Sequence, residues 1–542
     1  MSGSDDQLKT EISYNIDYFT IKRGMVYAHG WVFHPHLEIS EIQLCGKIAT
    51  GENSFTLDVC YPVDRPDVGL RFKNIPSVRQ SGFHILGKID VTQVNEEDFW
   101  LAIIFSDQQK CSISLANQSG ADIPSAPKSR IIKYGFIRSL QLLRQGKFAI
   151  LKNKIKKQLK PLLFLDKNLD AAWPLIQNRQ AVFILDHNLG GGANLYRERI
   201  ITEKLDQHTV VVLLTFSPIT LAYNVAFRTT EKEVTIAIDD IEDILEIAGK
   251  CRITSVIYND AVLFPDAIKV PELLLMLKNM AKGISLTINI NDYFPLCPSP
   301  HLLNDQNVYC DLPDQHICED CLARSRQPFI GFYGKIDIAD WRKKWFQALA
   351  VADNICCFST SSQKLLLRIH HELPKDIIQV KPHDMSYCGF FPLPAVPASP
   401  MRIGIVGDIN EHKGSKIVND VAEVIAKKGL PYRILVIGTI NEARHPKVLT
   451  QTGSFIHGDL PTILQENGIN ISFFPSICPE TFSFVVHELI KLQLPIVSFP
   501  YGAQGEVVGA YNKGRLLAGT NPEDILNELE KFHRDISGVK SL

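Results

Sequence analysis

The stretch "ISFFPSICPETFSFVVHELIKLQLPIVSFP", residues 471–500, decides the fold expected for the C-terminal part of the chain. Its first apolar run predicts a strand that ends at Ser476, followed by a loop that carries Glu480. A helix is expected to begin near Thr481, and "LPIVSFP" predicts the next strand. Apolar strands that alternate with helices indicate a parallel sheet covered on both faces.

Two carboxylates in this stretch suggest a binding site. Glu488 follows Glu480 by a little over two helical turns, so one continuous helix would place both on one face, about 12 Å apart. That separation is too large for a single metal and about the length of a nucleotide sugar. The backbone N–H groups near Thr481, Phe482, Ser483 and Phe484 would be free to bind phosphate or sugar oxygens. The alternative is a favourable charge of Glu480 at a helix N-terminus and an exposed Glu488.

The same alternation of strands and helices occurs twice. It starts near residue 180 with "AVFILDHNLGGG" and restarts after the proline-rich "PLPAVPASP" with "MRIGIVGD", followed by further expected strands that include "SFIHGD" (454–459). We therefore expect an α/β fold of two Rossmann-like domains with a cleft at the strand ends, where ligands bind in such folds.

Glycine-rich turns follow the first strand of each expected domain. Gly190, Gly191 and Gly192 would let the backbone approach a phosphate or sugar, and a helix N-terminus follows them. In "IGIVGDINEHKG", Gly407 ends a strand, and Lys413 and Gly414 end the loop. Lys413 could act as a point charge on a diphosphate, or it could be a solvated surface lysine.

The N-terminal third has a different pattern. Short alternating segments between residues 16 and 118, such as "GMVYAHGWVF" and "FWLAIIF", predict an antiparallel β-sandwich. Eleven Lys or Arg and no acidic residue lie between Lys128 and Lys160, interleaved with Ile, Leu and Phe. A basic amphipathic helix of this kind suits an anionic membrane surface, and packing on the next domain is the alternative.

Composition narrows the class of protein. With 542 residues, 45% hydrophobic and 21% charged, the chain can bury several cores. A net charge of -2 gives no reason to expect nucleic-acid binding. The N-terminus lacks a secretion-signal pattern and no apolar run reaches bilayer length, so we expect a cytoplasmic protein with reduced thiols.

Taken together, these motifs resemble family-four retaining glycosyltransferases of the GT-B fold. The resemblance covers about residues 180–535 and rests on the two glutamates with seven residues between them, on "VGDINEHKG" and on "LGGGANLYRE". It implies that Glu480 holds the transferred sugar, Glu488 the nucleotide ribose and Lys413 the leaving diphosphate. No catalytic metal is implied, and catalysis would be orientation plus electrostatic stabilisation of the leaving group.

Three positions depart from the family pattern. Asp408 replaces an arginine often found after the glycine of the diphosphate loop, and "KLQLP" lacks a usual glycine. In "NINDYFPLCP", Asn291 stands where the family usually has histidine before Asp292. Asn291 and Asp292 are still candidate catalytic residues, although an amide cannot take a proton from an acceptor.

A cysteine cluster lies within the expected insertion 291–325. The tight pair Cys318–Cys321, with Cys297 and Cys310, could supply the four thiolates of a structural zinc site. His301 and His316 in the same stretch are possible alternate ligands, although both are expected at the surface.

The resulting domain hypothesis has five parts. They are a tail (1–15), the sandwich (16–118), a basic helical linker (119–177), an acceptor-side Rossmann-like domain (178–395) and a donor-side one (396–542). The expected function is transfer of a sugar from a nucleotide-sugar donor to a glycan or lipid-linked acceptor, in bacterial surface polysaccharide (lipopolysaccharide, O-antigen) synthesis at the inner face of the membrane. The alternatives are another GT-B enzyme such as an epimerase, or a silent glycan-binding scaffold.

Overall fold

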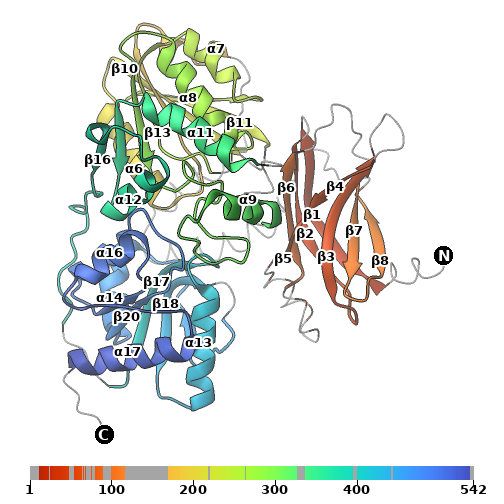
Figure 1. Cartoon of the computed structure of the whole chain (residues 1–542), viewed down its shortest axis with the longest axis vertical. Coiled ribbons are helices and arrows are strands. Elements are labelled where there is room, and N and C mark those ends of the chain that lie inside the picture. The colour runs from red at the N-terminus through yellow and green to blue at the C-terminus, as the bar shows by residue number, and fades with distance from the viewer. Residues whose placement is uncertain are drawn as a thin grey trace.

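We analysed a computed structural model of the chain. The structure describes residues 11–22, 25–47, 54–63, 82–88, 99–115, 169–217, 220–262, 264–325, 336–394, 399–440 and 443–537, with single residues between 64 and 81. It contains an N-terminal β-sandwich and two α/β lobes (Figure 1). The basic segment 128–160 lies outside the described residues, so the membrane-facing helix stays a prediction.

Two antiparallel four-stranded sheets form the predicted sandwich. Their orders are β1-β2-β6-β5 and β4-β3-β7-β8. The strands are β1 (Ser13–Lys22), β2 (Met25–Phe33), β3 (Ile39–Lys47), β4 (Ser54–Asp58), β5 (Cys60–Val63), β6 (Gly82–Lys88), β7 (Phe99–Phe105) and β8 (Lys110–Ser114). Alternate residues such as Val26, Leu44 and Leu101 point between the sheets and are fully buried. The run 54–61, expected as one strand, is divided between β4 and β5, which belong to different sheets.

An eight-stranded sheet forms the first lobe, in the order β12-β11-β10-β9-β13-β14-β15-β16. Its strands are β9 (Gln180–Leu185), β10 (Thr209–Ser217), β11 (Ala222–Arg228), β12 (Glu233–Ile238), β13 (Arg252–Tyr258), β14 (Ser285–Ile290), β15 (Asn354–Cys357) and β16 (Ile378–Val380). All pairs are parallel except those of β11 with β10 and β12, an antiparallel extension that the sequence reading missed.

The helices of the first lobe are α5 (Trp173–Ile176), α6 (Gly191–Lys204), α7 (Asp243–Gly249), α8 (Val270–Asn279), α9 (Gln315–Arg324), α11 (Ile338–Ala350) and α12 (Thr360–Ile369), with 3-10 turns Leu169–Ala171, Ala267–Lys269 and Lys375–Ile377. Trp341 and Trp345 of α11 are fully buried, and the Trp341 indole N–H donates to the Phe294 carbonyl at 2.8 Å. This bond ties the irregular segment after β14 to the core.

A six-stranded parallel sheet forms the second lobe, in the order β19-β18-β17-β20-β21-β22. Its strands are β17 (Arg402–Ile409), β18 (Arg433–Ile440), β19 (Leu449–Gln451), β20 (Ile471–Phe474), β21 (Ile496–Ser498) and β22 (Gly514–Leu516). Its helices are α13 (Ser415–Lys428), α14 (Leu460–Glu466), α15 (Phe484–Lys491), α16 (Gly502–Ala510) and α17 (Pro522–Ser537), with a 3-10 turn at His457–Asp459. The two Rossmann-like domains expected from the alternating pattern are therefore present.

Two local predictions for the second lobe were wrong. The helix expected from Thr481 begins at Phe484, because Ser483 has extended backbone angles (φ -114°, ψ 96°), so Glu480 lies in the preceding loop. The two glutamates therefore do not share one helix. The segment 454–459, "SFIHGD", was expected to be a strand, but its last three residues form the 3-10 turn, and β19 lies before it.

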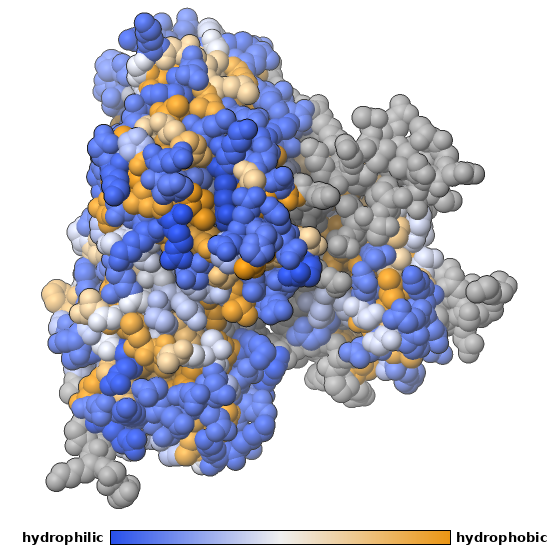
Figure 2. Space-filling view, viewed as in Figure 1, coloured by the Kyte–Doolittle hydropathy of each residue, from blue (hydrophilic) through white to orange (hydrophobic). Residues whose placement is uncertain are grey.

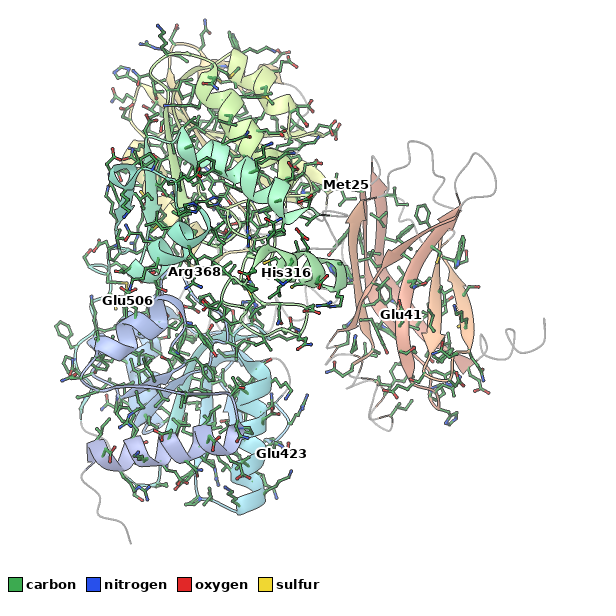
Figure 3. All side chains as sticks on the ribbon, viewed as in Figure 1. Met25, Glu41, His316, Arg368, Glu423 and Glu506 are labelled. Carbon is green, nitrogen blue, oxygen red and sulfur yellow. The ribbon has the colours of Figure 1, made fainter. Side chains whose placement is uncertain are left out.

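The two lobes contact each other across a waist, and the sandwich lies beside the first lobe (Figure 1). Helices α12 and α16 pack together at this waist, where the Ser361 N–H donates to Glu506 at 2.7 Å; Figure 3 labels Glu506 there. Met25 of β2 packs into the core of the first lobe. On the face shown in Figure 2, hydrophilic residues cover most of both lobes, with apolar groups between them. None of the described helices is long and apolar enough to cross a membrane.

Buried neutral histidines should make the folded chain sensitive to acid. Burial lowers the pKa of His370 to about 4, and its Nε2 lies 3.1 Å from the Pro295 carbonyl. The unfolded imidazole, with a pKa near 6.5, binds a proton first, so stability should fall as the pH drops from about 6.5 to 4. We expect His370→Gln to have a lower free energy of unfolding than the wild type at pH 7. Between pH 7 and 5, that free energy should fall by about 1–2 kcal/mol less in the variant than in the wild type, measured by urea unfolding. The exposed His208→Gln is the control, and an equal pH dependence in His370→Gln would contradict the expectation.

Candidate active site

The polar residues of interest lie at the carboxyl ends of the strands, at the points where each strand order reverses. These switch points fall between β9 and β13 in the first lobe and between β17 and β20 in the second. Loops that leave adjacent strands in opposite directions open a crevice there, where ligands bind in doubly wound sheets. The two crevices face each other, because Tyr293, just after β14, contacts Glu480, after β20: its hydroxyl donates to the Glu480 carbonyl at 3.4 Å.

The backbone of Glu480 is held by the start of α16. Its N–H donates to Gln504 Oε1 at 2.9 Å, and its carbonyl accepts from the Ala503 N–H at 2.8 Å. The same Gln504 side chain, which is fully buried, donates to the Cys478 carbonyl at 2.7 Å. Gly502 has a positive φ of 54°, and a Cβ there would lie 2.6 Å from the Glu480 backbone. The loop is thereby fixed on both sides of the carboxylate.

The next residue joins this loop to the first lobe. The Thr481 hydroxyl donates to the Asn291 carbonyl at 2.8 Å, and the Thr481 carbonyl accepts from Ser362 at 3.4 Å. Asn291 is itself held in place, because its amide donates to the Asn259 carbonyl and to Asn259 Oδ1 at 2.9 and 2.8 Å. The Asn291 side chain therefore points into its own lobe, and what it offers the cleft is a backbone carbonyl.

Lys413 is the cation nearest to Glu480. Burial raises the pKa of Glu480, and the charge of Lys413 acts in the opposite direction, so the two side chains are neighbours. Lys413 is half-buried, and among the described residues its ammonium has no hydrogen-bond or ion-pair partner. A half-buried ammonium lacking a fixed counter-ion is a favourable place for an anion.

Two glycines allow the chain segments of this site to approach each other. Gly414, at φ 83°, lies so close to β20 that a Cβ would be 2.1 Å from the Pro475 carbonyl oxygen. Gly407, at φ 122°, brings its carbonyl within 2.1 Å of the position that a Cβ on Gly438 would occupy. A side chain in place of Gly414 would push the Lys413 loop away from Pro475, where the loop carrying Glu480 begins, and one in place of Gly438 would meet the backbone of β17.

The glycine turn of the first lobe meets the start of α15. A Cβ on Gly192 would lie 2.5 Å from the Phe484 ring, whereas Gly190 and Gly191 have open space around them. Phe484 stacks on His383 at 5.0 Å, and Phe482 packs on His487 at 4.4 Å. The side chains of Phe482 and Phe484 therefore fill an aromatic contact between the lobes, and only their backbone could serve the ligand.

Glu488 occupies a separate polar pocket. It is the fifth residue of α15 and is 4% exposed. His457 Nε2 lies 2.7 Å from its Oε1, and the Tyr387 hydroxyl donates to the same oxygen at 3.4 Å. Tyr387 comes from the segment joining the lobes, and the Arg199 guanidinium of α6 lies 4.6 Å above its ring. The alternative of an exposed Glu488 was wrong.

Asp292 lies in a buried carboxyl cluster rather than in an open cleft. Its Oδ1 accepts from the Phe294 N–H at 2.7 Å, and Asp260 is its neighbour. Burial and the adjacent Asp260 raise the pKa of Asp292 well above its usual range, and burial raises that of Asp260 to about 7. Two buried carboxyls side by side favour a proton shared by the pair, since each disfavours a negative charge on the other. Asp408, the other departure, is exposed and accepts from the Thr439 hydroxyl at 2.7 Å.

The cysteine prediction is not supported. Within the described part of the chain, which includes all four thiols, no group of three or more His, Cys, Asp or Glu could hold a metal. Cys318 instead pairs with protein groups: its thiol donates to the Pro313 carbonyl at 3.7 Å, and Arg342 donates to its sulfur at 3.5 Å. His316, labelled on α9 in Figure 3, is exposed, as expected, whereas His301 is half-buried against the second lobe.

Several positioning groups had no signal in the sequence. Gln504 lies in an ordinary run of small residues, and His457 and Tyr387 lie 31 and 101 positions from Glu488. Only the folded chain brings them to the two glutamates.

The second lobe also matches a known family. Residues 394–537 match the family model described as glycosyl transferases group 1, and they contain Lys413, Glu480 and Glu488. The match supports the coarser part of the resemblance expected for residues 180–535, a glycosyltransferase domain, over the C-terminal portion of that range. No match was found among curated proteins.

Three solved structures are similar to part of the chain. The matched region covers 66% of this chain and 90–91% of each solved chain. The three structures are Anabaena Alr3699/HepE with UDP and glucose (13% identity, TM-score 0.39), sucrose-phosphate synthase from Thermosynechococcus elongatus (13%, 0.43) and the lipopolysaccharide outer core galactosyltransferase WaaB in its apo form (13%, 0.40).

Replacing Gln504 should loosen the Glu480 loop. Gln504→Leu leaves the Glu480 N–H and the Cys478 carbonyl without their buried partner, which costs about 1–3 kcal/mol for each group left unpaired. We expect a lower free energy of unfolding in urea and faster hydrogen exchange of the Glu480 amide. The exposed Gln465→Leu on α14 should change neither, and unchanged exchange in Gln504→Leu would refute the clamp.

Proposed function

We propose that the chain is a glycosyltransferase that moves a sugar from a nucleotide-sugar donor to a glycan or lipid-linked acceptor with retention of configuration. The observation that carries the proposal is the unpaired Lys413 ammonium beside Glu480 at the switch point of the group 1 domain. A cation and a carboxylate placed together there fit a ligand with a diphosphate at one end and sugar hydroxyls at the other.

In this proposal each residue has a defined task. Lys413 stabilises the charge that develops on the departing nucleoside diphosphate, and Glu480 accepts hydrogen bonds from hydroxyls of the transferred sugar. Glu488, with His457 and Tyr387, holds the ribose. The backbone of Gly190, Gly191 and Thr481 to Phe484 lines the cleft, and Gly407 and Gly414 shape the diphosphate loop. Catalysis then comes mainly from orientation and from electrostatic stabilisation, without a catalytic metal.

The structure changes the roles proposed for Asn291 and Asp292. The Asn291 carbonyl holds Thr481, so we propose a positioning role for Asn291 instead of a catalytic one. Asp292, buried beside Asp260, would stabilise the first lobe. The acceptor hydroxyl must then lose its proton to another group, and an oxygen of the departing diphosphate is the base that the proposed site supplies.

Nucleotide binding tests the proposal most directly. A ligand that binds only the folded state at a hundred times its dissociation constant adds about 2.7 kcal/mol of stability. We expect one member of a panel of UDP, GDP and ADP sugars to raise the melting temperature of the wild type, and Glu488→Ala to remove most of that shift. Glu466→Ala, an exposed glutamate of α14, is the control.

Turnover separates the proposal from its alternatives. A transferase needs an acceptor and loses activity in Glu480→Gln, while an epimerase converts the donor with no acceptor present. A binding scaffold would show the thermal shift without releasing any nucleoside diphosphate. Bacterial surface polysaccharide as the product and contact of the basic segment 128–160 with an anionic membrane are parts of the same proposal, supported by sequence resemblance and charge alone.

A structural zinc at Cys297, Cys310, Cys318 and Cys321 now rests on the spacing of the cysteines. The hypothesis predicts one zinc per chain by elemental analysis of purified protein, reduced in Cys321→Ser. Zinc well below one per chain would discard it, and the folded insertion would then depend on packing and on the Arg342–Cys318 contact.

A further inference from the structure

Two histidines from opposite lobes stack on each other beside Lys413. The rings of His301, which follows β14 in the first lobe, and His412, in the loop after β17, have centroids 4.1 Å apart and planes 20° apart. The His412 carbonyl accepts from the Ile477 N–H at 3.1 Å, so this histidine is fixed to the loop that carries Glu480. The pair thus bridges the cleft at the proposed diphosphate position.

The polar edges of both rings are unused. Among the described residues, no hydrogen bond reaches a ring nitrogen of His301 or His412, although both side chains are half-buried. Ring nitrogens that still reach solvent are available to a ligand that offers a hydrogen-bond acceptor. Together with the unpaired Lys413 ammonium, the nitrogens form a group of donors that lacks an acceptor.

Charge points to an anion as the missing partner. Lys413 is the charged group next to both imidazoles. Its charge also acts on two other titratable groups, Glu480 and Cys478. Glu411 precedes His412 in the sequence. Burial, with Lys413, lowers the pKa of His301 to about 4; burial, with His301 and Lys413, lowers that of His412 to about 2. Both rings are therefore neutral at pH 7, and Lys413 supplies the positive charge of this group.

We propose that His301 and His412 complete, with Lys413, an anion subsite that spans the two lobes and binds the diphosphate of the nucleotide sugar. This inference rests on the proposed function and adds to it residues from both lobes. The diphosphate accepts hydrogen bonds from the ring nitrogens, and its charge favours protonation of the pair, with the proton taken from solvent. Binding of the donor is thereby coupled to contact between the lobes.

Phenylalanine substitutions separate this role from simple packing. His301→Phe and His412→Phe keep an aromatic ring for stacking but remove the nitrogens. We expect each to weaken binding of the nucleoside diphosphate about tenfold or more, measured by calorimetry with UDP, GDP and ADP. His316→Phe, on the exposed face of α9 in the same insertion, is the matched control and should bind as the wild type does.

Proton uptake is the second measurement. Titrations at pH 7 in two buffers of different ionisation enthalpy give the number of protons bound with the ligand. We expect uptake by the wild type and less uptake by both Phe variants, a comparison in which the ligand's own ionisation cancels. His412→Gln is a polar replacement for use if a Phe variant does not fold. It should also show reduced proton uptake.

The outcomes separate this inference from the proposed function. If one diphosphate binds the wild type, loses affinity in Glu488→Ala and binds both Phe variants with unchanged affinity and proton number, the histidines only pack and the inference is overturned. If no nucleoside diphosphate binds the wild type, the proposed function fails and the subsite falls with it.

Discussion

The loop from Pro475 to Ser483 is the constraint on which the rest of the site depends. It leaves β20 in the centre of the second sheet, and three separate elements hold its backbone: α16 through Gln504, the segment after β14 through Asn291, and α12 through Ser362. A carboxylate on a free loop would sample many positions, and ordering it on ligand binding would cost affinity. Here the loop is ordered by the fold itself, and Gly414 and Gly502 provide the space that this close packing requires.

This constraint also determines how the lobes relate. Several contacts across the cleft involve the loop or its immediate neighbours: Thr481 with Asn291, Gly192 with Phe484 and His301 with His412. The lobes therefore meet around the site, and opening of the cleft would break contacts to the Glu480 loop. A ligand that binds at Lys413 would strengthen the same contacts. Donor binding and closure are thus expected to be one process in this protein, since both depend on the same short segments.

The sequence predicts the architecture well, for identifiable reasons. Long runs of buried β-branched residues, such as those of β10 and β17, can only be central strands, and the glycines after β9 and within β17 mark the turns that follow. Local pattern fails where tertiary contacts decide. The helix does not begin at Thr481, because the Thr481 hydroxyl and carbonyl form hydrogen bonds with the first lobe. In place of the strand expected at 454–459, the chain forms a turn that brings His457 to Glu488. The candidate site was recognisable from Lys413, Glu480 and Glu488, but the residues that position them lie far away in the sequence.

The departures from the family pattern become understandable once charge is considered. Asn291 carries no charge, and Asn259 holds its side chain. A second cation near Lys413 would repel the Lys413 ammonium in the free protein. The neutral stacked histidines avoid that repulsion while the cleft is empty, and they could acquire charge when an anion arrives. Burial raises the pKa of Glu480, and the charge of Lys413 opposes this increase, so the charge of Glu480 also depends on its neighbours. A site built from groups that adjust their charge to the ligand would combine a stable free protein with strong binding of a highly charged donor.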